Sequence, residues 1–486
     1  MNAPLQDLMD SLPYARPELL LAGWALLATL LGAWFKDKAF GLISGLSVLV
    51  LIGAGALALI DQPGAPVQLF QGAMVSDGVA VYAKVLMALA AAATLAIGAD
   101  HFSMTGERKF EFPILAVLAV LGMFVMVSAQ DLITLYVGVE LQSLSLYVLA
   151  AWRRDDARSS EAGLKYFVLS ALSSGLLLYG ASFIYGFTGS VRFDAIAAAV
   201  AEGAGGLGLI FGLVLLLCAL GFKMSAAPFH MWTPDVYEGA PTPMTAFFAA
   251  APKVAAVALM ARVLYEPFAD MAFQWQQVVA ALSAISMVWG SFAALLQTSL
   301  KRLMAYSSIA NMGFALMGLA AGEPEGAAAA LIYLTLYLPA TIGIFALILA
   351  MRRDNQPAET VDDLAGMAQR RPWMAGAFTM LLFSIAGIPP FVGFIGKLVV
   401  FREAIDAGFV WLAIVGAIAA VVAAAYYLRL LSSIWFKPAA AQLQPASGAI
   451  VVTASLAALL TFPVLVIVLG MIERWAETAV RASLSF

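Results

Sequence analysis

The hydrophobic positions along this chain gather into long blocks separated by short polar stretches. With a window of about 20 residues, the length that a helix needs to cross a bilayer, the pattern predicts roughly fourteen spans. Their approximate centres are Ala25, Val50, Ala90, Leu121, Glu140, Leu172, Leu215, Ala255, Ile285, Leu316, Leu338, Ile388, Val421 and Leu459. We therefore expect an all-α integral membrane protein, because helices satisfy their own backbone polar groups inside the bilayer.

Two of the predicted spans are interrupted by proline and glycine. The segment AAPFHMW interrupts the seventh span, and AGIPPFVGF, at residues 386–394, interrupts the twelfth. Paired broken spans in corresponding places indicate an inverted repeat with a functional site beside each break. The pattern thus predicts two inverted five-helix repeats, made of spans 4–8 and 9–13, with broken helices 7 and 12.

Four units follow from this arrangement. Residues 1–112 hold the N-terminal transmembrane helices 1–3, residues 113–265 the first five-helix repeat (helices 4–8) and residues 266–437 the second (helices 9–13), and residues 438–486 hold the C-terminal helix 14.

Composition supports a membrane protein and excludes several chemistries. Hydrophobic residues make up 63% of the chain and charged residues 12%, with a mean hydropathy of +0.93, whereas a soluble domain is nearer a quarter charged. One cysteine and two histidines are too few for an iron–sulfur cluster or a zinc site, each of which needs about four ligands. Nor does the sequence contain a glycine-rich nucleotide loop. We expect no metal and no cofactor in this chain.

The basic residues of the predicted loops are unevenly shared between the two sides of the membrane. One set of loops holds Lys36, Lys38, Arg108, Lys109, Arg153, Arg154, Arg158, Lys301, Arg302, Arg352, Arg353, Arg370, Arg371 and Lys437. The other set, with both termini, holds only Arg16, Arg192, Arg262, Arg402, Arg474 and Arg481. Because cytoplasmic loops carry the excess of Lys and Arg, the termini are predicted to be periplasmic.

Glu140 lies in the middle of a predicted span, DLITLYVGVELQSLSLYVLAAW. Tyr136, Ser143 and Tyr147 stand at −4, +3 and +7 from it, so the four form one polar stripe on an apolar helix. Such a stripe is expected to face protein or water rather than lipid, where it could support a proton path.

The remaining basic residues fall inside predicted spans or near their ends, and they are Lys84, Lys165, Lys223, Lys253, Lys397 and Arg429. Lys223 follows a long apolar run and precedes Pro228 by five residues, Lys253 lies about ten residues from either end of its span, and Lys397 follows the second broken segment. Near span ends, Lys84, Lys165 and Arg429 could instead extend to the interface. That is the preferred interpretation for Lys84, whereas Lys165 and Arg429 stay open.

Structural ion pairs are the simpler interpretation of Glu140, Lys223 and Lys253. However, a charge at membrane depth costs about 2.5 kcal/mol or more, and three buried lysines against one glutamate leave a positive excess that a structural network would normally balance. Burial and nearby positive charge weaken an amine's hold on its proton, and a nearby carboxylate strengthens it. The imbalance favours proton transfer, with the broken helices supplying hydrated gaps.

His230 lies in the proline-rich segment PFHMWTPDVYEGAPTP, close to Asp235 and Glu238. A metal site would lack ligands there. A histidine that carries a proton or a hydrogen bond is the favoured interpretation, and the prolines predict a rigid re-entrant segment.

Several strings together resemble one family. KMSAAPFHMWTPDVYEGAPTPMTAFFAAAPK closely resembles the antiporter-like membrane subunits of respiratory complex I, and its PDVYEGAPTP portion is similar to subunit N of the bacterial NADH–quinone oxidoreductases. YVGVELQSLSLYVL, LKRLMAYSSIANMGF and GIPPFVGFIGK match as well. The resemblance covers essentially the whole chain.

This resemblance implies a proton-translocating subunit of an NADH:quinone oxidoreductase, without redox centres and driven by quinone reduction elsewhere in the complex. It implies that Glu140 and Lys223 form a pair, that Lys253 is the central lysine and that Lys397 lies near the periplasmic exit. It also assigns Lys165 to the path. FMN, iron–sulfur clusters and quinone are expected in other subunits.

The resemblance also implies a multi-pass protein of the bacterial inner membrane. Its partners would be the antiporter-like subunit M, the small subunits A, J and K, and phospholipids, with no nucleic acid. The alternative is a subunit of an Mrp-type multisubunit cation/proton antiporter, which shares the fold and the charge pattern. A structural scaffold with an idle channel is a third possibility.

Overall fold

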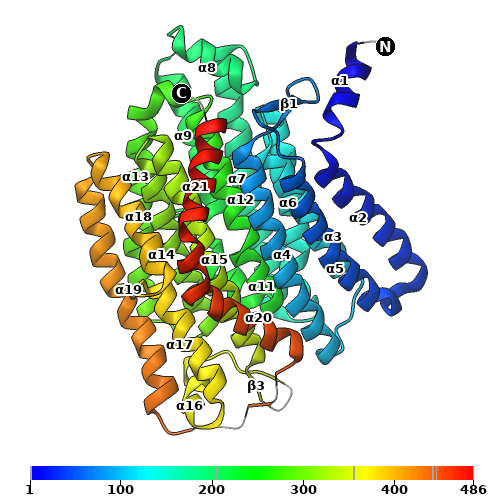
Figure 1. Cartoon of the computed structure of the whole chain (residues 1–486), viewed down its shortest axis with the longest axis vertical. Helices are drawn as coiled ribbons and strands as arrows, with labels where there is room; N and C mark the ends of the chain where they lie inside the picture. The colour runs from blue at the N-terminus through cyan, green and yellow to red at the C-terminus, as the bar shows by residue number, and fades with distance from the viewer. Residues whose placement is uncertain (1–2, 204, 354–355, 440–442, 445, 485–486) are drawn as a thin grey trace.

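The computed structural model describes residues 3–203, 205–353, 356–439, 443–444 and 446–484, so parts of the predicted units lie outside the described residues. Figure 1 shows a bundle of long helices running side by side. Within the described part, eleven helical segments are long and apolar enough to cross a membrane, and Glu111–Val127 and Pro372–Ala386 are shorter apolar helices. The predicted all-α membrane class is confirmed, and the count of fourteen spans stays a prediction.

The N-terminal part consists of helices and one short hairpin. Its elements are α1 (Ala3–Ser11), α2 (Arg16–Phe35), η1 (Lys36–Ala39), α3 (Phe40–Ile60), β1 (Val67–Leu69), β2 (Met74–Ser76) and α4 (Gly78–Thr105). The two strands are antiparallel, with Val67 opposite Ser76. Asp77 caps α4 by accepting a hydrogen bond from the Ala80 N–H, which satisfies one of the free donors at a helix start.

The next elements cover the first predicted repeat. They are α5 (Glu111–Val127), α6 (Leu132–Ala150), α7 (Ala157–Thr188), α8 (Phe193–Ala201), α9 (Leu207–Met224), α10 (Trp232–Gly239), α11 (Thr242–Ala249) and α12 (Ala251–Tyr265). Asp131 and Asp156 cap α6 and α7 with their side chains. Residues 225–231 separate α9 from α10, so the predicted interruption of the seventh span is confirmed.

The rest of the chain covers the second predicted repeat and the C-terminal helix. Its elements are η2 (Ala269–Met271), α13 (Ala272–Leu295), α14 (Leu300–Ala320), α15 (Pro324–Ala350), β3 (Arg352–Arg353), β4 (Gln356–Pro357), η3 (Val361–Leu364), α16 (Met367–Arg370), α17 (Pro372–Ala386), α18 (Val392–Asp406), α19 (Val410–Phe436), α20 (Gly448–Leu459), η4 (Leu460–Val464) and α21 (Leu465–Ser483). Residues 387–391 separate α17 from α18, which confirms the second predicted interruption. The repeat boundaries stay a prediction.

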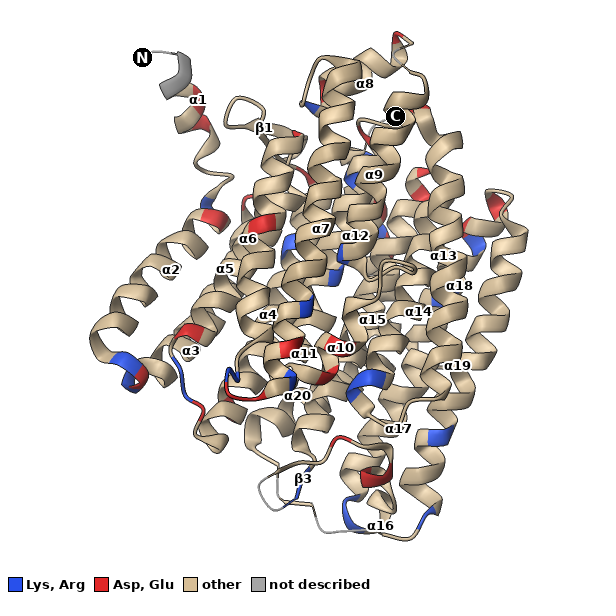
Figure 2. Cartoon of the chain, turned by 180° about the vertical axis from the view of Figure 1, so that it is seen from behind, with Lys and Arg blue, Asp and Glu red and all other residues tan. Residues whose placement is uncertain are grey.

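The two ends of the bundle differ in charge. The N-terminal helix α1 and the C-terminal end of α21 lie at the same end, and α16 and β3 lie at the opposite one (Figure 1). Figure 2 shows basic segments around α16, β3 and the lower end of α19. Which end faces the cytoplasm stays a prediction.

Lys84 does not extend to an interface, contrary to the preferred interpretation of its position. Its side chain is 2% exposed and its ammonium lies 2.6 Å from a carboxylate oxygen of Glu18, which belongs to α2. The sequence suggested an interface position because Lys84 is close to a span end, but Glu18 provides a buried counter-charge instead.

Candidate functional site

Lys223 lies in the last turn of α9, buried among three helices. Its Nζ donates hydrogen bonds to Ser143 Oγ of α6 at 2.7 Å and to Ser170 Oγ of α7 at 2.8 Å. The side chain is therefore held by neutral hydroxyl groups on both sides.

Glu140 is held separately from Lys223. Its carboxylate accepts a short hydrogen bond from Ser174 of α7, and no ion pair within 4.0 Å joins it to Lys223 in the described part of the chain. The direct pair that the family resemblance implies is therefore absent from this conformation, because serines of α6 and α7 lie around the two charges.

The polar stripe of α6 faces two environments. Ser143 and Tyr147 are buried, whereas Tyr136 and Glu140 are partly exposed on the face of the isolated chain. The Tyr147 ring packs edge-on against Tyr166, with 5.1 Å between the ring centroids. The stripe thus connects the interior beside Lys223 with the outer surface at Glu140.

Lys253 lies in the first turn of α12 and reaches the carbonyl end of α9. Its Nζ donates to the Met224 carbonyl oxygen at 3.0 Å and makes a shorter hydrogen bond to Ser225 Oγ. The ammonium also lies 5.4 Å from the centroid of the Trp232 ring, the first residue of α10. Lys223 and Lys253 are thus neighbours at one helix break.

Lys397 repeats this arrangement at the second break. Its Nζ donates to the Ala386 carbonyl oxygen at 2.8 Å, at the end of α17, and lies 5.0 Å from the Phe314 ring centroid. Gly387 follows with a φ of 82°, and a Cβ there would come within 2.8 Å of Lys397 Cδ. Glycine is required on both counts, for the left-handed conformation and for the space.

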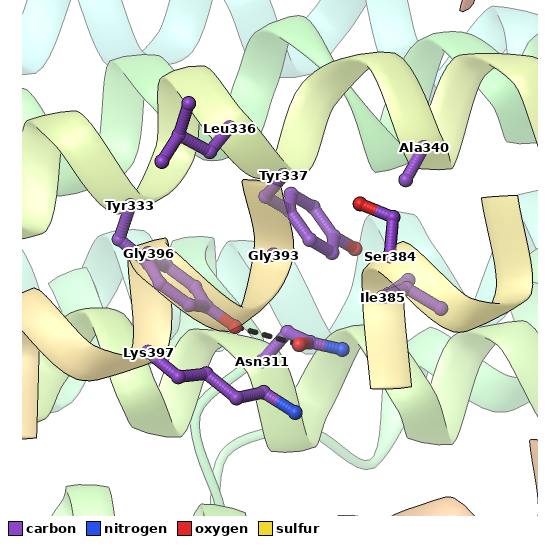
Figure 3. Close-up of a pocket in the computed structure, with 10 residues that line it drawn as sticks. All are labelled: Asn311, Tyr333, Leu336, Tyr337, Ala340, Ser384, Ile385, Gly393, Gly396 and Lys397. Atoms are coloured by element: carbon purple, nitrogen blue, oxygen red, sulfur yellow. Dashed lines mark hydrogen bonds between the residues drawn. The ribbon is translucent and has the colours of Figure 1, made fainter. Parts of the chain in front are cut away.

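A small cavity adjoins Lys397 (Figure 3). Its volume of about 10 Å³ suits roughly one water molecule. Tyr333 donates a 2.6 Å hydrogen bond to Asn311 Oδ1 in its wall. The Tyr337 and Ser384 side chains also line it, and neither hydroxyl has a hydrogen-bond partner within the described residues. Buried polar groups without partners are typical of sites that hold ordered water.

Lys253 and Lys397 therefore share one geometry. Each donates to a terminal carbonyl of an interrupted helix, where the negative end of the helix dipole stabilises positive charge. No carboxylate lies within ion-pair distance of either ammonium among the residues that the structure describes. An ammonium held by carbonyl and hydroxyl oxygens can lose and regain a proton without leaving a buried carboxylate unpaired.

Three other predicted or open positions lie apart from these lysines. The half-buried His230 ring packs 5.9 Å from Trp289 and 6.5 Å from Tyr306, between centroids, and its Nδ1 has no partner within the described residues. Arg429 is exposed and donates to the carbonyl oxygens of Leu295 and Gln297, at the end of α13. Lys165 lies within α7, two turns after its first residue Ala157, with its side chain 41% exposed.

Lys165 joins an ion cluster rather than the buried lysines. It lies 2.7 Å from Glu161 and 2.8 Å from Asp235, and Arg302 lies 2.7 Å from the other oxygen of Asp235. Burial alone would raise the pKa of Asp235, which belongs to α10 between the long spans. The hydrogen bonds from Lys165 and Arg302 hold that pKa below its usual value, so the carboxylate is ionised at neutral pH.

Sequence reasoning missed several residues that contact the charges. Ser170 and Ser174 of α7 bind Lys223 and Glu140, Ser225 binds Lys253, and Asn311 and Tyr333 line the Lys397 cavity. The string FVLSALSSG carries a signal for α7, because Ser170, Ser173 and Ser174 recur at helical spacing.

A family model and curated relatives match this chain. The model of the family described as "NADH:quinone oxidoreductase/Mrp antiporter, TM" matches residues 129–423. A protein of Parvibaculum lavamentivorans named NADH-quinone oxidoreductase subunit N is 51% identical over 451 residues, which are 92% of each chain. The protein of the same name from Rhodospirillum rubrum is 50% identical over 436 residues, which are 89% of this chain and 90% of that one.

Solved structures share the fold. A chain of respiratory complex I from Thermus thermophilus has a TM-score of 0.82 and 33% identity, over 95% of this chain and 99% of that one. A chain of the Mrp complex from a Dietzia species has a TM-score of 0.84 at 22% identity, over 97% of this chain and 98% of that one. At that identity the second similarity supports the fold alone.

Proposed function

Because this chain belongs to the NADH:quinone oxidoreductase/Mrp antiporter membrane family, among relatives named NADH-quinone oxidoreductase subunit N, we propose that it moves protons across the bacterial inner membrane. Quinone reduction elsewhere in the complex drives the movement. Glu140 controls the proton held by Lys223, Lys253 accepts it along the middle of the membrane, and Lys397 passes it toward the periplasm.

The observation that carries this proposal is the pair of buried lysines at the two helix breaks. Lys253 and Lys397 are 1% and 6% exposed, and each is held by carbonyl or hydroxyl oxygens rather than by a carboxylate. A permanent structural charge would be expected to have a buried counter-ion. The small polar cavity beside Lys397 adds room for water at a position where a proton could leave.

The partner proposal is supported by the outer face of α6. A carboxylate at membrane depth is rarely left against lipid, yet Glu140 is partly exposed on this chain alone. A neighbouring membrane subunit that covers α6 removes this exposure. The antiporter-like subunit M and the small subunits A, J and K are the proposed neighbours.

The test replaces Lys223 with arginine, which keeps the positive charge but cannot release a proton near neutral pH. We expect Lys223→Arg and Lys223→Ala to lose most quinone-coupled pumping in membrane vesicles, with assembly verified on blue-native gels. Lys437→Arg is the matched control, because Lys437 has a half-exposed side chain 3.5 Å from Asp362 at the end of α19. An assembled Lys223→Arg complex that pumps like wild type makes Lys223 a structural charge and refutes the mechanism.

The alternative is a subunit of an Mrp-type cation/proton antiporter. The similarity to the Mrp complex shows the same fold, whereas the relatives near 50% identity carry the oxidoreductase name. The two proposals differ in the complex that the chain joins. Co-purification of the tagged chain with NADH dehydrogenase activity supports the first, and cation/proton exchange without that activity supports the second.

A further inference from the structure

Asp235, which belongs to α10, joins this helix to α7 and α14. It accepts from Lys165 of α7 and from Arg302 of α14, and Arg302 also lies 3.1 Å from Glu238, one turn later on α10. Arg302 comes from the second predicted repeat, so α10 is tied to both halves of the chain. This cluster of Lys165, Asp235 and Arg302 is here called the α10 triad.

Helices α7 and α10 also meet beside this ion pair, through two aromatic rings. Tyr166, which follows Lys165 on α7, stacks on Trp232 of α10 with 4.4 Å between ring centroids and 6° between ring planes. Trp232 Nε1 donates to the Phe222 carbonyl oxygen of α9 at 3.0 Å. The Trp232 ring also lies 5.4 Å from the Lys253 ammonium.

The packing between α7 and α10 leaves little freedom. A Cβ on Gly239 would lie 2.6 Å from the Arg158 carbonyl oxygen and 2.7 Å from the Ala162 Cβ. The helices therefore approach at backbone distance at one end of α10, and the Tyr166–Trp232 stack joins them at the other. The ion pair between Lys165 and Asp235 lies between these two contacts.

We propose that Lys165 and Asp235 are positioning residues for Lys253: their ion pair keeps α7 and α10 in the register that places the Trp232 ring beside the Lys253 ammonium, and Arg302 ties this unit to the second repeat. The proposal rests on the proposed function, and it changes the role on the proton path that the family resemblance implies for Lys165. Lys165 acts through Asp235 and does not carry a proton itself.

Exposure supports this division of roles. The side chains of Lys165 and Asp235 are 41% and 32% exposed, whereas Lys223, Lys253 and Lys397 are buried. Every hydrogen bond or ion pair of Lys165 goes to Glu161 or Asp235 within the described residues. Half-exposed ion pairs stabilise a fold only slightly, so the triad can be broken without losing the protein.

The test is a double-mutant cycle in vesicles that contain the assembled complex. Lys165→Met, Asp235→Asn and the combined variant are compared for pumping relative to NADH–quinone electron transfer and for the pH profile of pumping. We expect each single variant to lower coupled pumping several-fold. We also expect the two single variants to shift the pH profile of pumping equally. The double variant should be no worse than the worse single one, because one contact is lost in all three.

Two further variants make the outcome decisive. Lys165→Arg keeps the ion pair and should pump at least half as well as wild type, which a proton carrier could not do. Arg154→Met is the control, because the neighbouring Arg154 is 85% exposed and pairs only with Asp155 among the described residues, and it should have no effect.

The opposite results overturn the proposal. If Lys165→Arg fails as completely as Lys223→Arg, Lys165 carries protons. If the double variant falls to the product of the two single fractions, Lys165 does not act through Asp235. If electron transfer and pumping fall together with an unchanged pH profile, the triad is only structural. Failure of the proposed function itself is read separately, from the Lys223→Arg variant in the same vesicles.

Discussion

Among single residues, Lys84 and Glu18 form one of the buried ion pairs that the proposed path does not use. It joins α4 to α2, and both side chains are almost inaccessible. Burying a charge pair contributes little net stability, but removing one partner leaves the other as an isolated buried charge. A substitution of one partner should therefore destabilise the protein, whereas substitution of both partners should cost much less stability.

We predict that Lys84→Met destabilises the protein by about 3–5 kcal/mol, the range for breaking a buried pair. Lys84→Met combined with Glu18→Met should recover most of this loss, because no unpaired charge remains. The melting temperature and the assembled fraction on blue-native gels report the difference. Equal stability of the single and double variants would show that an unpaired charge on Glu18 is not the cause of the loss.

The residue contacts show what the sequence could and could not predict. Lys223, Lys253 and Lys397 stand out in the sequence because a lysine inside an apolar span is rare, and the structure buries all three. The partners of Lys223, Lys165 and Lys84 could not be found in this way. These partners, Ser170, Asp235 and Glu18, lie 53, 70 and 66 residues away along the chain. Hydrophobic periodicity predicts each helix but does not show which other helix packs against it.

Between elements, α5 and α6 approach each other at backbone distance near the site. A Cβ on Gly138 would lie 2.6 Å from the Met126 backbone nitrogen, and one on Gly122 would lie 2.4 Å from the Gln142 nitrogen. Small residues let membrane helices pack at backbone distance. This contact fixes α6, the helix that carries Glu140 and Ser143.

We predict that Gly138→Val pushes α6 away from α5 and lowers both stability and pumping. Overpacking of this kind typically costs about 1–3 kcal/mol, and the shift moves Ser143 away from Lys223. Gly175→Val on α7 is the control, since nothing lies within 4 Å of a Cβ there. Thermal melting of the assembled complex and vesicle pumping should separate the two variants. A Gly138→Val protein that matches the control would mean that α5 and α6 adjust freely.

The elements themselves were largely predictable, but their internal breaks were only partly so. Proline and glycine located the interruptions at 225–231 and 387–391, because proline removes a helical hydrogen bond and glycine readily adopts non-helical conformations. The sequence predicted one continuous last span, whereas a π-helical turn with Pro463 separates α20 from α21. A single proline in an apolar run does not decide between a kink and a break, since neighbouring helices determine which occurs.

For the whole molecule, the surface of the isolated chain is incomplete. Glu140 and Tyr136 are partly exposed at membrane depth on α6, and a polar face of this kind is stable only when another protein covers it. We predict that cells lacking the neighbouring membrane subunits contain little of this chain. Blue-native gels and immunoblots of such cells test this, with the complete strain as control. A stable, monodisperse monomer extracted from the deleted strain would contradict the prediction.

The direction of the bundle in the membrane is the other property of the whole molecule that can be tested. Exposed Arg154 and Arg370 belong to the basic loops, whereas exposed Gln68 lies on the hairpin at the end that holds α1 and the end of α21. Because cytoplasmic loops carry the excess of basic residues, we predict that a cysteine at position 68 reacts with a membrane-impermeant thiol reagent in intact cells. Cysteines at 154 and 370 should react only after the cells are opened.

The chain has one cysteine, Cys218, so a Cys218→Ser parent gives a clean background and serves as the control. Labelling of position 370 in intact cells would reverse the orientation, and it would also reverse the proposed direction of proton movement from Lys223 to Lys397.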